Sequence, residues 1–442
     1  MAVVIGKPLI LGGGMSAYIN VTCPEGTTLT CTNGVIVLTA TASDGTYRFR
    51  VHKKDSWTIK GTDSNGAEDS VSVLISEDGQ VESVEVLMVR VYGISRNITS
   101  SSPAWTRTDR AVDMTLRMHP KSVNAIASDF DDVMPWAGIE RVTLSCAEGI
   151  EDVMVRIPKF YYKRARNGNT ESIQIADGPR SGFSIHPLFY RAGKEYECAY
   201  VGAYKTSTYT RSVKYGAPDH SARVGWYRDK AALKGAGWGI LDHAAFSAIQ
   251  MLMLVECATN DVQMVIGEGY TDKWNETPLV AGTCDSVPNL FGHPSGDEGT
   301  VDVVWRGIEG LWGNVCEYVD GLLVYDGVYY VCEDPAKYAG QLTSDYKDVG
   351  YVGTTTWTSA FIKYTGLSNA YPHIMLPTNA DGGSSSTYYC DRCSASNGLM
   401  VVSHGGMMWD GVGAGLFTID YTQDTGSADN YYGGSRLMYM PS

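Results

Sequence analysis

The sequence predicts an α+β protein in which an N-terminal β-sandwich precedes a larger α+β domain with long loops. Three observations support this fold class. Residues 1–93 alternate apolar and polar side chains with a period of two, residues 241–258 form one apolar run of helix-favouring residues, and the chain after about residue 264 is rich in Gly, Trp and Tyr with few periodic runs. We therefore expect three parts, namely the sandwich over 1–93, a connector over 94–150 and the larger domain over 151–442.

Alternating stretches separated by tight-turn dipeptides define the first part. The alternating positions include Val35, Val37, Thr39 and Thr41, and then Tyr47, Phe49 and Val51. Between such stretches lie Asn33-Gly34, Asp44-Gly45, Asn65-Gly66 and Asp78-Gly79, which suit turns that require a positive φ. Short strands with turns at this spacing are typical of an antiparallel sandwich. The segment resembles the small immunoglobulin-like modules of phage tail and bacterial surface proteins.

The elements after residue 93 give fewer periodic signals. Ser100 to Pro103 has the composition of a linker inside the connector. The stretch from Val153 to Lys163 is typical of a strand with an aromatic end. Residues 241–258 predict a helix that Asp242 can cap, and its apolar side chains cover most sides, so we expect it to be buried. We expect a compact scaffold to hold the long loops after about residue 264.

Charge and composition exclude several classes of function. Lys and Arg number 35 and Asp and Glu number 49, and the resulting net charge of −14 is poorly suited to non-specific nucleic-acid binding. No apolar run reaches the about 18 residues that a membrane-spanning helix needs, so we expect no membrane insertion. The 10 cysteines are scattered singly, which favours free thiols over a disulfide scaffold.

Sequence motifs of common enzymes are missing. The chain contains no GxSxG, HExxH, GxxxxGK(S/T) or GxGxxG motif. Cys390 and Cys393 form its one CxxC pair, and a zinc site would need a second pair at suitable spacing. The sequence therefore favours a protein that is not an enzyme and needs no cofactor.

Three short motifs follow one another in the C-terminal part of the chain. Residues 311–320 (LWGNVCEYVD) resemble the GNVWEW-type motif of the formylglycine-generating enzyme family, and the three motifs come in the order of that family. Residues 405–409 resemble its RGGSW motif, with His404 in place of the Arg and Met407 in place of the Ser, and residues 434–437 resemble its closing G-(F/S)-R strand. The resemblance implies a C-type-lectin-like fold for the larger domain.

The resemblance does not extend to the oxidase activity of that family. Those enzymes place their working cysteines after the RGGSW-like element, whereas the last cysteine of this chain, Cys393, precedes it. Asn314 and Glu317 match positions linked to a calcium site in some members. The alternative is that both are buried hydrogen-bonding residues that fix the loop, and the sequence leaves calcium and this alternative open.

The C-terminal segment has the composition of a binding surface. Residues 381–442 contain 11 Gly, 9 Ser and 6 Tyr, but no Lys and no Glu. Protein interfaces are depleted in Lys and Glu and enriched in Tyr, Trp, Met and Arg. Antibody-type binding surfaces favour Tyr, Ser, Gly and Asn, because Tyr offers a large contact area at a low entropy cost.

This segment resembles the variable segment in the variable proteins of diversity-generating retroelements, in which a C-type-lectin-like domain carries a mutagenised segment on a constant framework. Here the variable segment would cover about residues 389–432, with pieces such as Ala414-Gly415-Leu416-Phe417 as framework. The resemblance implies a non-enzymatic receptor-binding (adhesion) protein of a phage tail that displays a diversified, hypervariable surface to a host-cell receptor, either protein or glycan. The alternatives are a formylglycine-generating-enzyme-like oxidase and a purely structural tail component.

The expected ligand contacts all lie in this segment, with Trp409 and Tyr421 as rigid anchors. They are Asp391, Arg392, Ser394, Ser396, His404, Met408, Trp409, Asp410, Asp420, Tyr421, Gln423, Asp424 and Tyr431. The resemblance also implies other tail proteins as partners and a homo-oligomer, with a trimer favoured. It places the protein in the virion tail, with the bacterial cell surface as the alternative.

Overall fold

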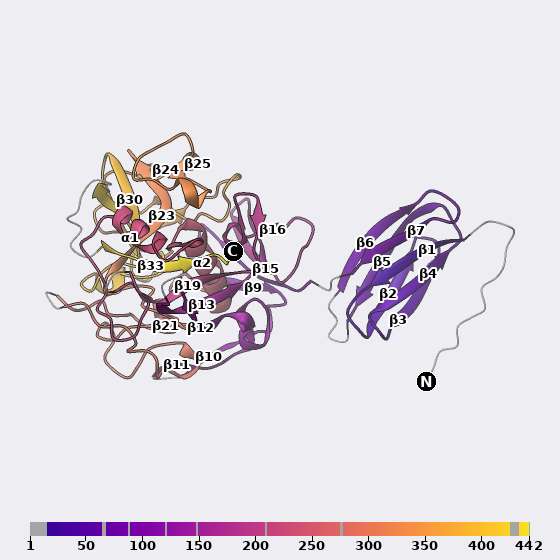
Figure 1. Ribbon diagram of the computed structural model, residues 1–442, viewed down its shortest axis with the longest axis horizontal. Helices are drawn as coiled ribbons and strands as arrows, with labels where there is room; N and C mark the ends of the chain where they lie inside the picture. Colours follow the sequence, from indigo (N-terminus) through magenta and orange to yellow (C-terminus); the bar gives the residue numbers. More distant parts are fainter. Residues whose placement is uncertain are drawn as a thin grey trace. The chain divides into compact units, whose positions relative to one another are not determined.

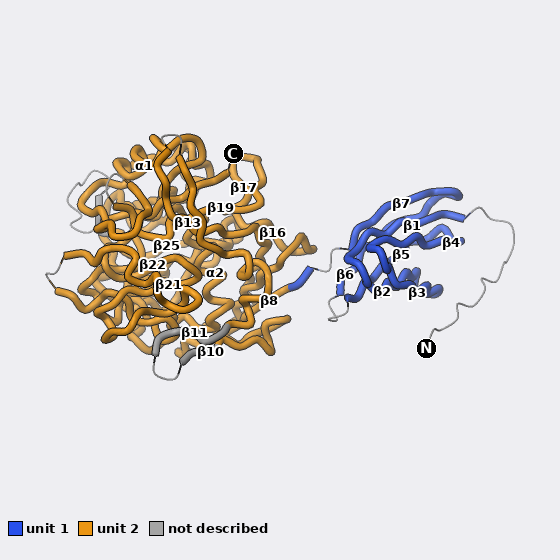
Figure 2. Tube along the Cα trace, turned by 60° about the horizontal axis from the view of Figure 1, so that its bottom comes forward, with its two compact units in different colours: residues 1–90 blue, residues 91–442 orange. Residues whose placement is uncertain are grey.

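The chain forms two compact units, Met1–Arg90 and Val91–Ser442, which Figure 2 shows in different colours. The computed structural model describes residues 16–63, 68–86, 89–119, 122–146, 149–207, 210–274, 277–424 and 433–441. Strands hold 42% of the residues and helices 12%, which confirms a β-rich α+β class. Within these described ranges, no helix is long and apolar enough to cross a membrane.

Two β-sheets enclose one apolar core in the first unit (Figure 1). Its strands are β1 (Ala17–Thr22), β2 (Thr27–Thr32), β3 (Val37–Ala42), β4 (Thr46–Val51), β5 (Asp55–Thr62), β6 (Glu68–Ile75) and β7 (Val81–Glu85). One sheet has the order β4-β1-β7 and the other the order β3-β2-β5-β6. Alternate residues of the strands point inward, so Ile19, Leu29 and Trp57 are buried between the sheets.

Glycine turns join these strands as the sequence predicts. Gly34, Gly45 and Gly79 have φ angles of 84°, 78° and 80°, in the left-handed region where a residue without a Cβ avoids strain. At Gly45 a Cβ would also lie 2.9 Å from the carbonyl oxygen of Cys23. The predicted Asn65-Gly66 turn lies outside the described residues.

The described part of the second unit contains three multi-stranded sheets. The first runs in the order β16 (Ser184–Ile185), β14 (Tyr161–Asn167), β15 (Thr170–Ala176), β8 (Val91–Asn97) and β9 (Thr106–Asp109). The second runs β12 (Glu140–Ser145), β13 (Glu151–Pro158), β19 (Cys198–Lys205), β33 (Arg436–Tyr439) and β20 (Trp238–Ile240). The third runs β25 (Lys347–Val352), β24 (Val328–Val331), β23 (Cys316–Tyr325), β30 (Leu399–His404), β31 (Ile419–Asp424), β29 (Arg392–Ala395) and β26 (Ala360–Phe361), with β32 (Gly433–Gly434) paired to β23.

Short two-stranded ribbons and helices complete the unit. The ribbons pair β10 (Leu116–His119) with β11 (Ser122–Ser128), β17 (Tyr190–Arg191) with β18 (Lys194–Glu195), β21 (Val304–Trp305) with β22 (Ile308–Glu309), and β27 (Tyr364–Thr365) with β28 (Pro377–Asn379). The α-helices are α1 (Val224–Ala232), α2 (His243–Cys257) and α3 (Gln263–Ile266).

Helix α2 is the buried helix that the sequence predicts. The carboxylate of Asp242 caps it by accepting hydrogen bonds from the amides of Ala244 and Ala245 at 3.1 and 3.0 Å. The helix ends at Ala258, which takes a left-handed conformation. It contacts β8 and β15 of one sheet and β23 of another, so its apolar side chains fill the space between them.

The structure places residues 94–150, where we expected a connector, within the second unit. Strand β8 begins at Val91 and pairs with β15 along seven residue pairs, from Val91↔Ala176 to Asn97↔Thr170. Trp136 is fully buried, lies edge-on to Tyr92 at 5.5 Å and Phe130 at 4.7 Å, and donates from Nε1 to the carbonyl oxygen of Leu252. This aromatic packing makes the segment part of the core.

We expect Trp136→Ala to lower the free energy of unfolding of the second unit by about 3–5 kcal/mol, because it leaves a large cavity in the aromatic core. Chemical unfolding followed by fluorescence measures the loss. Trp226→Ala is the matched control, since Trp226 lies on α1 and is 38% exposed. A similar loss in both variants would contradict the core position of Trp136.

Candidate functional site

Glu317 brings the three motifs of the C-terminal domain together in space. On β23 it lies opposite His404 of β30 and beside Gly434 of β32. Arg436 of β33 donates to its carboxylate from Nε at 2.9 Å and from Nη2 at 2.6 Å. Lys205 of β19 donates from Nζ to the same carboxylate at 2.7 Å. All of these charged side chains are almost completely buried.

Charge keeps this carboxylate ionised despite its burial. Burial raises the pKa of Glu317, but attraction to Arg436 and Lys205, with a smaller effect from His404, outweighs burial and lowers that pKa to about 2. Arg436 also donates to the carbonyl oxygens of Gly202 and Glu309, so its donors are engaged on both sides. The cluster therefore ties β19, β23 and β33 together.

The same geometry bears on the calcium candidates. Both oxygens of Glu317 already accept hydrogen bonds from the two cations. The amide of Asn314 bonds to Leu279 in both directions, accepting from its N–H at 3.0 Å and donating to its carbonyl at 2.9 Å. Over the described residues, no group of three or more His, Cys, Asp or Glu side chains is arranged to hold a metal ion. The hydrogen bonds of both side chains support the second interpretation, and calcium binding stays a prediction.

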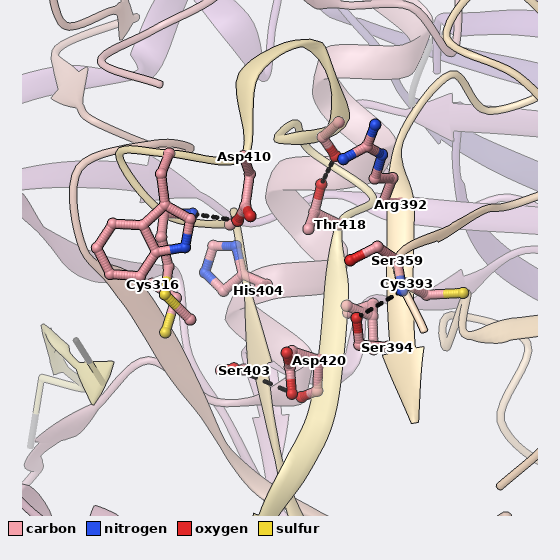
Figure 3. A pocket seen from close by; sticks show the side chains of 15 residues that line it. Cys316, Ser359, Arg392, Cys393, Ser394, Ser403, His404, Asp410, Thr418 and Asp420 are labelled. Carbon is pink, nitrogen blue, oxygen red and sulfur yellow. Dashed lines mark hydrogen bonds between the residues drawn. The ribbon is translucent and has the colours of Figure 1, made fainter. Parts of the chain in front are cut away.

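A pocket of about 210 Å³ lies beside this cluster (Figure 3). Six of the expected contact residues line it: Arg392, Ser394, His404, Trp409, Asp410 and Asp420. They come from β29, β30 and β31, which are neighbours in the third sheet, and from the turn after β30. Residues separated by up to 28 positions in the sequence are thus brought to one cavity.

Charged and polar groups face each other across this pocket. Arg392 lies 4.7 Å from the centre of the Phe361 ring, and Ser394 accepts a hydrogen bond from the amide of Ser359 at 3.1 Å. Asp410 accepts from the amide of Met407 at 2.7 Å. Burial raises the pKa of Asp410 above its ordinary value, and the negative charge of Asp420 adds to that rise. The pocket thus offers both a cation and carboxylates to a polar ligand.

Two tryptophans add an aromatic surface at this pocket. The rings of Trp274 and Trp409 meet edge to face with their centres 5.9 Å apart. Trp274 is 72% exposed, which is unusual for so large an apolar side chain, while Trp409 is half-buried and lines the pocket. The amide of Lys273 donates to the carbonyl of Met408 at 2.6 Å and so holds the two segments next to each other.

Four expected contact residues are buried and require a correction. Tyr421, expected as an exposed anchor, is fully buried, packs edge-on against Tyr329 and donates its hydroxyl to the carbonyl of Thr354 at 2.8 Å. Asp391 accepts from the amide of Phe417, and Met408 is buried in the turn. His404 is buried as well, although its ring reaches the pocket wall. A macromolecular ligand cannot touch the first three, because framework atoms cover them.

The remaining expected contacts lie away from the pocket or beyond the described side chains. Ser396 is half-buried just after β29 and does not line the pocket. Gln423 and Asp424 belong to β31, whose backbone is described there without these side chains. Tyr431 lies outside the described residues.

Several residues of the pocket were missed by reasoning from sequence. Cys316 and Cys393 both lie on its wall, although both precede the RGGSW-like element in the chain. Burial raises the pKa of Cys316 to about 12 and also raises that of Cys393, so both thiols stay protonated near neutral pH and are poor nucleophiles. Ser403 and Thr418 of the wall were also missed. So was Trp274, which reaches the pocket only through its contact with the ring of Trp409.

Comparisons with known proteins add little to this geometry. Neither a protein family nor a curated protein matches the sequence. One solved structure with limited similarity is a DUF4876 family protein from Bacteroides thetaiotaomicron, with 10% sequence identity over 35% of this chain and 37% of that chain. Its TM-score of 0.12 is too low to support an argument about fold or function.

We expect Glu317→Gln to lower the free energy of unfolding by about 3–5 kcal/mol, because it removes the negative charge that both buried cations bind directly. Chemical denaturation at neutral pH measures this loss. Glu195→Gln is the control, because the ion pair of Glu195 with Lys159 is partly exposed and is worth about 0–1 kcal/mol. A loss no larger than that of the control would contradict the role of Glu317.

We expect His404 to make the protein less stable as the pH falls from about 6.5 towards 3. Burial, chiefly, lowers the pKa of His404 from 6.5 to about 3, so in this window the unfolded chain binds a proton that the folded chain does not. His404→Phe keeps a ring against Phe246 and cannot titrate. Unfolding free energies measured from pH 7 to pH 3 should fall less steeply for this variant, and parallel curves would contradict the assignment.

Proposed function

We propose that this chain is a non-enzymatic receptor-binding (adhesion) protein whose C-terminal pocket and its tryptophan rim contact the ligand. The observation that carries the proposal is that Arg392, Asp410 and Asp420 all line one cavity. All three are half-buried, and all three come from the segment that contains no Lys and no Glu. Residues with nothing in common except their place in a segment of unusual composition would instead be spread over the protein surface.

The chemistry of the pocket fits recognition of a polar ligand. Arg392 supplies charged donors and the two aspartates supply acceptors, so hydroxyl, amide or charged groups can be oriented. The volume of about 210 Å³ suits one side chain or one sugar ring. Trp274 and Trp409 extend the contact area beyond it, in the manner of aromatic anchors at binding hot spots.

The framework beneath the pocket supports binding rather than catalysis. Neither wall thiol has the low pKa of a nucleophilic or metal-binding cysteine, because burial raises the pKa of both. Cys316 and Cys393 therefore do not support the alternative of an oxidase. Buried partners such as Tyr421 and Glu317 hold the strands that present the contact residues, which lowers the entropy cost of binding.

The biological setting that we propose follows from the family resemblance. The two-sheet first unit suits an immunoglobulin-like spacer, and the meeting of three motifs at Glu317 suits a C-type-lectin-like domain. A diversified variable protein of a phage tail, assembled as a trimer with other tail proteins and presented to a host-cell protein or glycan, fits both features. A near-copy of the 3′ end of the gene that differs only at adenines and lies beside a reverse transcriptase would test the diversification.

We expect Trp409→Ala and Arg392→Ala each to reduce binding of the labelled protein to whole host bacteria by about tenfold or more, with little change in the melting temperature. The reason is that both side chains are half-buried at the pocket while the framework stays intact. Flow cytometry over a panel of bacterial strains measures the binding, and thermal unfolding measures stability.

Two controls give this experiment its meaning. Trp226→Ala removes another partly exposed tryptophan, on α1 and outside the pocket, and should bind as the unaltered protein does. Tyr421→Ala should instead lower the melting temperature, because Tyr421 is framework. Unchanged binding in both pocket variants, or an equal loss with Trp226→Ala, would overturn the proposal.

A further inference from the structure

A second cavity, of about 350 Å³, lies in the larger unit away from the residues of the C-terminal pocket. Its wall includes Arg96 of β8, Arg166 of β14, Tyr351 of β25, and Tyr364 of β27. Thr99 and Thr378 add hydroxyl groups to the wall. The volume lies within the usual range of small-molecule sites, and the wall combines aromatic rings with a few polar groups, as such sites do.

This cavity has an excess of positive charge. Arg164, Arg96 and Arg166 all approach one buried carboxylate, that of Glu171, at 2.6, 3.1 and 3.4 Å. Burial raises the pKa of Glu171, but attraction to the three guanidinium groups outweighs burial and holds it at about 2. Among the described residues, no second carboxylate forms an ion pair with these arginines, so three positive charges face one negative charge.

Two of the three arginines are held in place by several contacts with the protein. Arg164 is completely buried and donates to the carbonyl oxygens of Ile374 and Gly366 at 3.0 and 2.9 Å, in addition to Glu171. Arg96 lies between the rings of Trp105 and Tyr389, at 4.7 and 4.6 Å, and donates to the Tyr389 hydroxyl. Their positions are fixed by these contacts.

Arg166 differs from both. Its Nη2 reaches Glu171 and the carbonyl of Thr365 only at 3.4 Å each, which makes weak hydrogen bonds. Its Nε is buried and has no hydrogen-bond partner, while the side chain as a whole is 27% exposed and lines the cavity. A buried donor without a partner is uncommon, and it belongs to the arginine whose guanidinium is the least firmly held of the three and lines the cavity.

We infer that this cavity binds a sugar-sized molecule that carries a carboxylate, held by Arg166 and packed against the Tyr364 ring. A guanidinium group matches a carboxylate with two parallel hydrogen bonds, and the excess positive charge favours an anion over a neutral molecule. The ring of Tyr364 and the wall threonines then face the uncharged part of the molecule. This inference does not depend on the role proposed for the C-terminal pocket.

Calorimetric titration of the full-length protein with sodium D-glucuronate tests the inference, with D-glucose as the neutral match and sodium sulfate as a carbon-free anion. Glucuronate should bind, and glucose and sulfate should bind at least about tenfold more weakly. Equal binding of sulfate would reduce the site to a general anion site, and equal binding of glucose would remove the role of the carboxylate. Either result, or no binding of glucuronate, overturns the inference.

Variants of Arg166 test whether glucuronate binds in this cavity. Arg166→Gln should weaken glucuronate binding by about tenfold, and Arg166→Lys, which keeps the charge but loses the two-pronged donor, should also weaken it. Lys163→Gln removes the same charge from an exposed position of β14 outside the cavity and should leave binding unchanged. Thermal unfolding checks that each variant is folded. Full affinity in folded Arg166→Gln, or an equal loss in Lys163→Gln, overturns the assignment.

Discussion

The buried carboxylate of Glu317 is the interaction on which the C-terminal strands depend. Lys205 and Arg436 reach it from β19 and β33, and both of those strands belong to a different sheet from β23. A buried ion cluster of this kind adds little net stability compared with apolar packing, but removing one member is costly because the others stay buried and charged. It therefore holds the C-terminal strand β33 in one arrangement, and the shape of the neighbouring pocket depends on that arrangement.

Four of the six proposed contact residues in the pocket wall lie on strands, and the other two lie in the turn after β30. Arg392 and Ser394 lie on β29 and Asp420 lies on β31, and β29 pairs directly with β31 through Ser394↔Asp420. Trp409 and Asp410 follow β30 in a turn where Asp410 accepts from the amide of Met407. Side chains on such a frame lose little freedom on binding, so a modest pocket can still discriminate between ligands.

Much of the unusual composition of the C-terminal segment serves the framework rather than the surface. Tyr389 and Tyr421 are buried, and the Tyr389 ring lies against the guanidinium of Arg96 and meets the Phe417 ring edge to face. Gly405 has a φ of 87°, and a Cβ there would lie 2.8 Å from the carbonyl oxygen of Leu311. The high Tyr and Gly content thus has two structural causes, because Tyr supplies large buried rings and Gly allows close approach of the backbone. Composition alone does not distinguish these structural roles from a role in a binding surface.

What the sequence determined by itself was local. The alternation of apolar and polar residues and the glycine turns predicted the β-rich first unit, and the capped apolar run predicted helix α2. These features could be predicted because they depend on residues that are neighbours in the chain. The tertiary structure alone decided which side chains meet. It packed Phe130 and Trp136 into the core of the second unit, buried Asp391 and Tyr421, and brought Cys316, Cys393 and Arg392 to one wall. Periodicity shows that one face of a strand is buried, but sheet order and register decide which distant strand covers it, and those depend on long-range pairing that no local pattern encodes.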